Sequence, residues 1–243
     1  MVFMKAILLC GGKGSRLESI AEGMPKILMP VQGKAVGEHL IEFFKRYGIL
    51  DVVLAVGYKA DLIREAFGDG SSMGAHIKYV EESQPLGTAG ALKLAGSLLD
   101  STFIVSNGDE LKDMNLDKMI RFHKSKKALA TIALARVDDP SVYGVAEMKA
   151  GRIVRFVEKP KAGETQSHMI NAGLYVMESE VVNMIPEGFC MLERDIFPKI
   201  ASMRRLYGFP FRDQWFDIGT PERYEKAKKE WKSLAASSSS KST

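Results

Sequence analysis

The 243-residue sequence lacks the features that mark several large classes of protein. It contains two cysteines, Cys10 and Cys190, which form neither a C-x-x-C pair nor a metal-binding spacing. No apolar run approaches the ~20 residues that a membrane-spanning helix needs. The short apolar stretch at the N-terminus is interrupted by Lys5, so no signal peptide is expected. These absences predict a cytoplasmic protein with no membrane partner.

Positive charge is in slight excess and is not concentrated in one segment. The chain has 34 Lys and Arg residues and 30 Asp and Glu residues, and its formal net charge is +4 at pH 7. Because the basic residues are spread without a dense run, a nucleic-acid partner is not expected. A phosphorylated small molecule suits this charge balance equally well. A hydrophobic content of 46% supports a substantial core.

The most informative stretch is the glycine-rich segment of residues 10–17, which follows an apolar run at residues 6–9. Such a run is typical of a buried parallel strand. Three glycines leave backbone amides uncovered by side chains, namely Gly11, Gly12 and Gly14. A turn of this kind can approach an anionic group closely. Since Arg16 and Lys26 add positive charge, we interpret the segment as a triphosphate-binding loop.

This segment matches neither of the two common phosphate-binding motifs. Its spacing does not fit the P-loop pattern G-x-x-x-x-G-K-[ST], and Leu17 stands where the dinucleotide pattern G-x-G-x-x-G needs its third glycine. A simple chain reversal after the first strand is the alternative for a bare G-G-x-G. Arg16 and the Pro25-Lys26 pair favour phosphate binding over that alternative.

Strand-like and helix-like segments alternate through the first half of the chain. Strands are predicted at residues 51–56, 77–82, 103–105 and 130–137. This alternation predicts an α/β protein with a Rossmann-like, mostly parallel sheet that has helices on both faces. Ligands of such sheets lie beyond the carboxyl ends of the strands. The glycine-rich segment, Glu82, Gly87 and Asp109 all fall at that edge.

From Tyr143 the pattern changes to a hairpin around residues 149–151 and further short strands, which predict a small mixed lobe above the site. A helix is expected over residues 191–203, and another after Thr220 as N-cap and Pro221. We expect one domain over residues 1–235, with parts at 1–140, 141–220 and 221–235. The Ser-rich residues 236–243 are expected to be disordered.

Two aspartates are candidate metal ligands. Asp109 follows a predicted strand, and Asp217 lies between Phe216 and Ile218. Mg²⁺ usually takes one or two carboxylates together with phosphate oxygens, although either aspartate can also be explained as a structural cap. The four histidines are scattered, and neither a Ser-His-Asp nor a Cys-His arrangement is visible. Phosphoryl and nucleotidyl transfer rely on positioning and electrostatics, so they do not need such a nucleophile.

Taken in order, the motifs resemble those of the sugar-1-phosphate nucleotidyltransferases, also called nucleotide-sugar pyrophosphorylases. The pattern is closest to the mannose-1-phosphate and heptose-1-phosphate guanylyltransferases. The matching segments are GGKGSRL at 11–17, PKILMPVQGK at 25–34, PLGTAG at 85–90, NGD at 107–109, YG at 143–144, EKP at 158–160, NAG at 171–173 and DIGTP at 217–221. Ala35 departs from the proline that the family often has after Gly-Lys, and residues 18–21 look like the heptose branch.

The resemblance implies the nucleotide-diphospho-sugar transferase fold and transfer of a nucleotidyl group from a nucleoside triphosphate to a sugar 1-phosphate. Catalytic roles are implied for Arg16, Lys26 and Asp109, and Mg²⁺ binding for Asp109 and Asp217. Nucleotide contacts are implied for Gly11, Gly12, Gly14, Glu82, Gly87 and Thr88. Sugar-phosphate contacts are implied for Gly144, Glu158, Lys159 and Asn171, which make the 141–220 part a sugar-binding lobe.

The residue five positions before Gly87 bears on the choice of base. Family members that use UTP or dTTP commonly have Gln there, whereas this chain has Glu82. A carboxylate only accepts hydrogen bonds, and guanine offers two donors on one edge. We therefore favour GTP, with a mannose- or heptose-type sugar. The alternative is that Glu81 or Glu82 simply ends a strand in solvent.

Three other functions are weighed against a guanylyltransferase. One is a uridylyl- or thymidylyltransferase acting on glucose 1-phosphate or N-acetylmuramic acid 1-phosphate. Another is a non-catalytic regulatory homologue that binds a sugar nucleotide, although the retained Arg16, Lys26, Asp109 and Asp217 argue against it. A nicotinamide-dependent dehydrogenase is disfavoured by Arg16 and Leu17. The sugar is left open, and so is the formation of a homo-oligomer.

Overall fold

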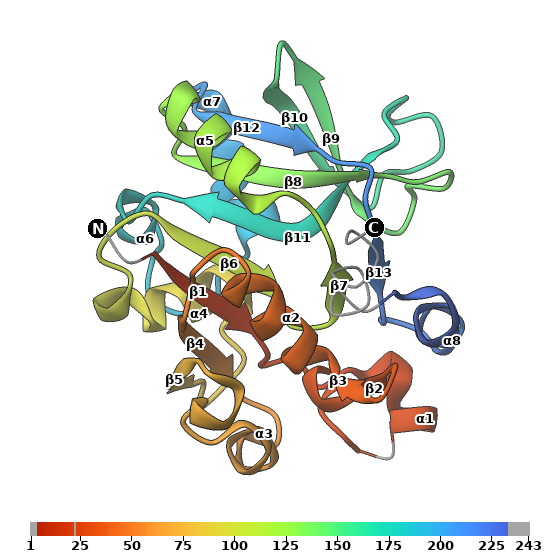
Figure 1. Cartoon of the computed structure of the whole chain (residues 1–243). Helices are drawn as coiled ribbons and strands as arrows, with labels where there is room; N and C mark the ends of the chain where they lie inside the picture. The colour runs from red at the N-terminus through yellow and green to blue at the C-terminus, as the bar shows by residue number, and fades with distance from the viewer. Residues whose placement is uncertain (1–3, 22, 233–243) are drawn as a thin grey trace, which may run out of the picture.

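One nine-stranded sheet runs through the computed structural model, which describes residues 4–21 and 23–232 (Figure 1). Its parallel part consists of β5 (His76–Glu81), β4 (Asp51–Val56), β1 (Lys5–Leu9) and β6 (Phe103–Asn107), in that order. The predicted parallel arrangement therefore holds for the first half of the chain. The predicted disordered tail at 236–243 lies outside the described residues.

The second half of the chain continues the same sheet with mixed strand directions. Beyond β6 follow β11 (Met169–Met177), β8 (Ala130–Arg136), β12 (Leu206–Pro210), β10 (Arg152–Glu158) and β9 (Gly144–Lys149). β11 is antiparallel to both β6 and β8, and β12 is parallel to β8. The predicted hairpin is formed by β9 and β10 around Ala150 and Gly151, which both have positive φ.

Helices cover both faces of the sheet, as predicted, because each strand alternates its buried side chains between two cores. Ala6 and Leu8 of β1 pack in one core, and Ile7 packs in the other. The first core is covered by α2 (Val36–Lys45), α3 (Ala60–Phe67), α5 (Leu116–Lys126) and α8 (Pro221–Glu230). The second is covered by α4 (Gly87–Leu94), α6 (Glu180–Asn183) and α7 (Phe197–Ser202). None of these helices is long and apolar enough to cross a membrane.

The helix expected over residues 191–203 is divided in the structure. A π-helical turn spans Leu192–Ile196, and α7 begins only at Phe197. Pro198 is the second residue of α7, a position where a proline is tolerated. Because proline has no N–H, it cannot donate the backbone hydrogen bond that would continue an α-helix from the preceding turn. The start of α8 agrees with the prediction, since the Thr220 hydroxyl accepts from the N–H of Arg223.

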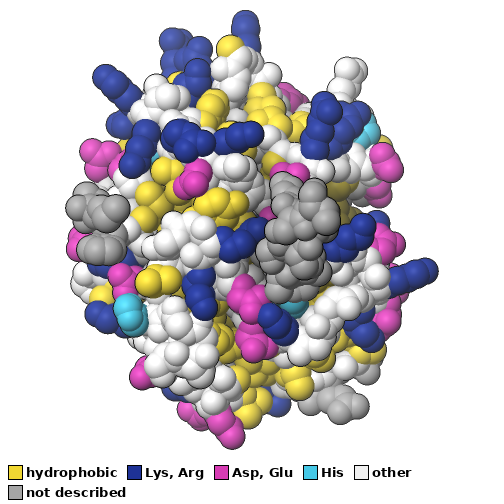
Figure 2. All heavy atoms as spheres, in the orientation of Figure 1, with side chains coloured by type: hydrophobic (Ala, Val, Ile, Leu, Met, Phe, Trp, Pro, Cys, Tyr) yellow, Lys and Arg dark blue, Asp and Glu magenta, His cyan; other side chains and the backbone are white. Residues whose placement is uncertain are grey.

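Small elements extend from the sheet edge where the parallel strands end. β7 (Glu110–Lys112) pairs antiparallel with β13 (Trp215–Asp217), and β2 (Pro30–Val31) pairs with β3 (Lys34–Ala35). A short helix, α1 (Glu18–Ala21), follows the glycine-rich loop. Figure 2 shows Lys and Arg side chains spread over one face, with acidic and apolar side chains between them.

Candidate active site

The carboxyl ends of β1, β4 and β6 are joined closely by backbone hydrogen bonds. The N–H of Gly108 donates to Leu9 O at 3.0 Å, and the N–H of Cys10 donates to Ala55 O at 2.8 Å. A Cβ at position 108 would lie 2.9 Å from Leu9 O, so only glycine permits this approach. The glycine-rich loop and the Asn107-Gly108-Asp109 turn are thereby brought side by side.

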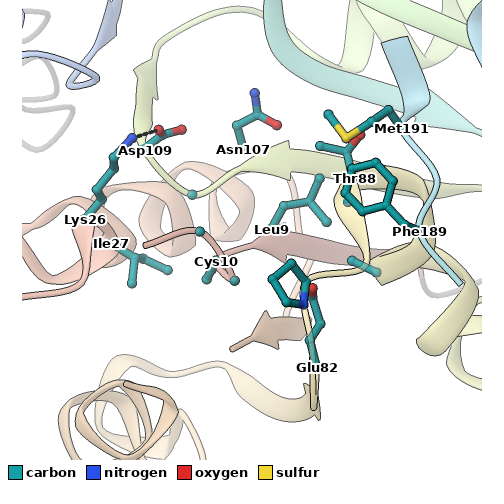
Figure 3. A pocket seen from close by; sticks show the side chains of 16 residues that line it. Leu9, Cys10, Lys26, Ile27, Glu82, Thr88, Asn107, Asp109, Phe189 and Met191 are labelled. Atoms are coloured by element: carbon teal, nitrogen blue, oxygen red, sulfur yellow. Dashed lines mark hydrogen bonds and ion pairs between the residues drawn. The ribbon is translucent and has the colours of Figure 1, made fainter. Parts of the chain in front are cut away.

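A cavity of about 330 Å³ opens at this edge (Figure 3). Seven of the predicted site residues line it, namely Gly11, Gly12, Lys26, Glu82, Gly87, Thr88 and Asp109. Lys26 and Asp109 lie at one end, and Phe189, Met191 and Thr88 lie at the other (Figure 3). Five of the six residues that the sequence assigned to the nucleotide therefore line one cavity, and Gly14 is the exception.

The end of the cavity at Lys26 and Asp109 carries opposite charges. Lys26 Nζ lies 2.8 Å from Asp109 Oδ2, and both side chains are partly exposed. Gly14 has a φ of +68°, and a Cβ there would lie 2.9 Å from Cε of Lys26. The lysine side chain therefore passes over Gly14 to reach the aspartate.

Glu82 lines the cavity apart from both of these ends (Figure 3). One oxygen accepts from the N–H of Leu86 at 2.9 Å, and the other lies against Gly11, where a Cβ would be 2.6 Å away. Burial raises the pKa of Glu82, while the hydrogen bond from Leu86 opposes that shift. Each carboxylate oxygen has two lone pairs, so Glu82 retains the capacity to accept from a ligand.

The hydroxyl proton of Thr88 is already donated within the protein. Its Oγ1 donates to Glu193 at 2.8 Å and accepts from the N–H of Leu192 at 2.8 Å. Thr88 therefore contributes to the cavity wall by holding the π-helical turn against α4. Its predicted contact with the nucleotide stays a prediction.

Asp217 lies on the strand next to Asp109. In the β7–β13 pair Asp217 is opposite Glu110, and the N–H of Ile218 donates to Asp109 O at 3.0 Å. Asp217 is held by Tyr143 Oη at 2.8 Å and by the Arg223 guanidinium at 3.0 Å. Burial and the nearby Asp217 raise the pKa of Tyr143 well above its usual value, so its hydroxyl remains a donor to the carboxylate.

Two carboxylates are enough for a magnesium ion that is also bound by phosphate. Within residues 4–21 and 23–232, no group of three or more His, Cys, Asp and Glu side chains is arranged to hold a metal. Mg²⁺ needs fewer protein ligands than that, because phosphate oxygens and water complete its shell. Asp109 lines the cavity and Asp217 does not, so the predicted binding of Mg²⁺ by both carboxylates stays a prediction.

Glu110, the carboxylate that follows Asp109 in the chain, is buried. It accepts from Asn107 Nδ2 at 2.7 Å and from Trp215 Nε1 at 2.8 Å. Lys112 Nζ, fully buried, lies 3.7 Å away and donates to Gly173 O at 3.0 Å. Sequence reasoning missed this network, because a strand of three residues gives too short a pattern to show which side chains face inward.

Of the predicted sugar-phosphate residues, Gly144, Glu158 and Asn171 lie on β9, β10 and β11, and Lys159 directly follows β10. None of them lines the 330 Å³ cavity. Gly144 pairs with Glu158, and a Cβ at Gly144 would lie 2.8 Å from a Glu158 oxygen. Burial raises the pKa of Glu158. Lys159 Nζ is exposed, 3.8 Å from Glu158 Oε1. Asn171 donates to Tyr175 Oη and accepts from the N–H of Gly173. Their roles toward a sugar phosphate stay predictions.

Arg16 is exposed on the 3-10 turn Ser15–Leu17, beyond the residues that line the cavity. The structure brings Lys26 and Asp109 together but does not place Arg16 with them. The predicted catalytic role of Arg16 therefore also stays a prediction.

The chain belongs to the Nucleotidyl transferase family, whose model matches residues 5–233. It is 38% identical to a mannose-1-phosphate guanylyltransferase from Mycobacterium tuberculosis over 224 residues, which are 90% of this chain and 62% of that protein. It is 37% identical to a mannose-1-phosphate guanyltransferase from Yarrowia lipolytica over 91% of this chain and 62% of that protein. The chain thus spans about 62% of the length of these relatives.

Two solved structures share the fold. HddC from Yersinia pseudotuberculosis, solved with GMP-PN, is 29% identical, with a TM-score of 0.80 over 94% of this chain and 100% of that chain. A Bacillus anthracis protein solved with sucrose and assigned as a glucose-1-phosphate thymidylyltransferase is 27% identical, with a TM-score of 0.85 over 93% and 94%. The predicted family and fold are confirmed.

Proposed function

We propose that the protein transfers GMP from GTP to mannose 1-phosphate or a related heptose 1-phosphate, with release of pyrophosphate. The observation that carries this proposal is the arrangement of the cavity, which has a lysine–aspartate pair at one end and the Glu82 carboxylate apart from that end. The M. tuberculosis and Y. lipolytica relatives support the reaction, and the HddC complex with GMP-PN supports a guanine nucleotide.

In the proposed reaction an oxygen of the sugar phosphate attacks the α-phosphorus of GTP. The bond from that phosphorus to the oxygen bridging to the β-phosphate breaks, and its electrons leave with pyrophosphate. Lys26 neutralises charge on the phosphates, and the uncovered amides of Gly11 and Gly12 donate hydrogen bonds to them. These groups act by position and charge, so the chemistry needs no covalent intermediate with the protein.

We further propose that Asp109 and Asp217 hold Mg²⁺ when the nucleotide is bound. The ion would screen the triphosphate and stabilise the charge that develops in the transition state. Tyr143 and Arg223 hold Asp217 through its two oxygens, which fixes the orientation of that carboxylate. Lys26 is then free to turn from Asp109 to a phosphate oxygen. A cytoplasmic location and the contacts of Glu158, Lys159 and Asn171 with the sugar phosphate belong to the same proposal.

The test is a matrix of four nucleoside triphosphates against mannose, heptose, glucose and N-acetylmuramic acid 1-phosphates, scored by pyrophosphate release with and without Mg²⁺. We expect the largest kcat/KM for GTP with a mannose- or heptose-type substrate, and loss of turnover when Mg²⁺ is removed. A larger value for UTP or dTTP would support the thymidylyl- or uridylyltransferase alternative. Absence of turnover with every pair would support a regulatory homologue.

A further inference from the structure

Phe189 is the most exposed large apolar side chain among the described residues, and it lies on the cavity wall. Its exposed fraction is 61%, compared with 57% for Val154, which lies away from the cavity. Figure 3 shows the ring beside Met191 and Thr88, at the opposite end from Lys26 and Asp109. An aromatic ring left in water at the mouth of a pocket gains stability when a flat apolar surface covers it.

The backbone of Cys190, directly after Phe189, is fixed to the start of α4. The N–H of Cys190 donates to Leu86 O at 2.9 Å, and Cys190 O accepts from the N–H groups of Ala89 and Gly90 at 3.0 and 3.1 Å. Two amides at the N-terminus of α4 are therefore already used within the protein. They are not free to bind a phosphate, so this end of the cavity suits an uncharged part of the nucleotide.

Two glycines permit this close approach. A Cβ at Gly87 would lie 2.6 Å from Cys190 O, and a Cβ at Gly90 would lie 2.7 Å from Gly188 O. Leu86, which receives the hydrogen bond from Cys190, also donates its own N–H to Glu82. The backbone beside Phe189 is thus connected through Leu86 to the Glu82 carboxylate, which keeps residue 189 close to that carboxylate.

We propose that Phe189 stacks on the base of the bound nucleotide while Glu82 binds the edge of the same base. The inference rests on the proposed nucleotidyl transfer and extends it to a residue that selects the nucleotide. A purine presents a larger flat surface than a pyrimidine, so the stack favours purine nucleotides. Glu82 then distinguishes guanine, which offers two donors on one edge, from adenine.

The test compares F189A with F189Y and with V154A, which truncates another exposed apolar side chain away from the cavity. The dissociation constants of GTP and UTP are measured by equilibrium titration, and kcat and KM are measured by pyrophosphate release. We expect F189A to weaken GTP binding about tenfold, the effect of losing one stack of a base on an aromatic ring. We expect a smaller loss for UTP and values near wild type for F189Y and V154A.

The KM for mannose 1-phosphate separates a base contact from a general disturbance of the site. If Phe189 contacts only the base, this KM and kcat stay within about twofold of wild type in F189A, since the phosphate end keeps its groups. Equal losses for GTP, UTP and the sugar phosphate would overturn the inference, as would GTP binding that F189A leaves unchanged.

The binding measurement also separates this inference from the proposed reaction. If wild-type protein released no pyrophosphate with any pair of substrates, the guanylyltransferase proposal would fail. Titration with GTP would still support the stacking of Phe189 on the base if F189A bound GTP more weakly than wild type. Equal affinities of F189A and wild type for GTP would contradict it. A change in oligomeric state of F189A without a change in GTP affinity would assign the ring to a protein contact instead.

Discussion

Asp109 and Glu110 are adjacent carboxylates that each face a lysine, yet the two pairs differ in almost every physical respect. The Asp109–Lys26 pair is close, at 2.8 Å, and both side chains are partly open to the cavity, with 33% and 18% exposed. The Glu110–Lys112 pair is 3.7 Å apart, with 10% and 0% exposed. Asp109 lies in the turn that precedes β7, whereas Glu110 is the first residue of that strand and is buried by its pairing with β13.

This difference indicates two separate tasks. The open pair costs little to break, because water and a phosphate can replace each partner. The buried pair is braced by Asn107 and Trp215 and fixes β7 against β13. That pairing brings the backbone after Asp217 against Asp109, so the buried network holds the two proposed metal ligands in neighbouring segments, while the open pair lines the cavity.

The buried pair is broken most directly by Lys112→Met. Glu110 would remain buried without its cation, and we expect the free energy of unfolding to fall by about 3–5 kcal/mol. Urea denaturation measures the loss. The double variant Glu110→Gln/Lys112→Met should be less destabilised than the single one, because it leaves no uncompensated charge. If the free energy of unfolding of Lys112→Met lies within about 1 kcal/mol of wild type, the Glu110–Lys112 pair does not stabilise the fold.

The open pair is tested by Asp109→Asn, which keeps the size of the side chain. We expect kcat to fall by about 10²–10³-fold, the range for a lost electrostatic contact in the transition state. The unfolding free energy should change by less than about 1 kcal/mol. The matched control is Glu110→Gln, for which we expect the reverse: lower stability and nearly normal kcat below its melting temperature. Equal effects of Asp109→Asn and Glu110→Gln on kcat would contradict the separate tasks of the open and the buried pair.

The base end is tested by Glu82→Gln. An amide presents one donor group and one acceptor to the base, so the fit to the two donors of guanine is lost. We expect KM for GTP to rise about tenfold, equivalent to ~1.4 kcal/mol, with a relative gain for UTP or dTTP. Steady-state kinetics with all four nucleotides measure the change. Unchanged relative kcat/KM values would exclude Glu82 from base recognition.

The smallest expected effect is a pH dependence of GTP affinity. Burial raises the pKa of Glu82, and only the ionised carboxylate accepts from both guanine donors. The KM for GTP should therefore rise as the pH falls through this raised pKa, while the KM of the Glu82→Gln variant should lack that component. The difference between the pH profiles of KM for wild type and Glu82→Gln reports on Glu82 alone. Identical profiles would contradict the proposed contact of Glu82 with the base.

The parallel part of the sheet and the residues at its carboxyl edge were predictable because local patterns determine them. An apolar strand followed by glycines or by Asn107-Gly108-Asp109 carries its own signal, and parallel strands necessarily end at one edge. Asp217 needed the resemblance as well, since its neighbour in space is more than 100 residues away in the chain.

Phe189 and the buried network were not predictable for a related reason. Phe189 reaches the cavity only because Cys190 pairs with Leu86, a contact that no local pattern reveals. Lys112 is fully buried in a three-residue strand, where its charge made an exposed position the natural expectation. Sites that depend on contacts between distant segments require the folded structure.

Pyrophosphate release from GTP, measured with and without mannose 1-phosphate in the presence of Mg²⁺, tests the central claim most directly. The account predicts release that requires the sugar phosphate and falls about 10²–10³-fold in Asp109→Asn. Release that does not depend on any sugar 1-phosphate, or an Asp109→Asn variant as active as wild type, would contradict it.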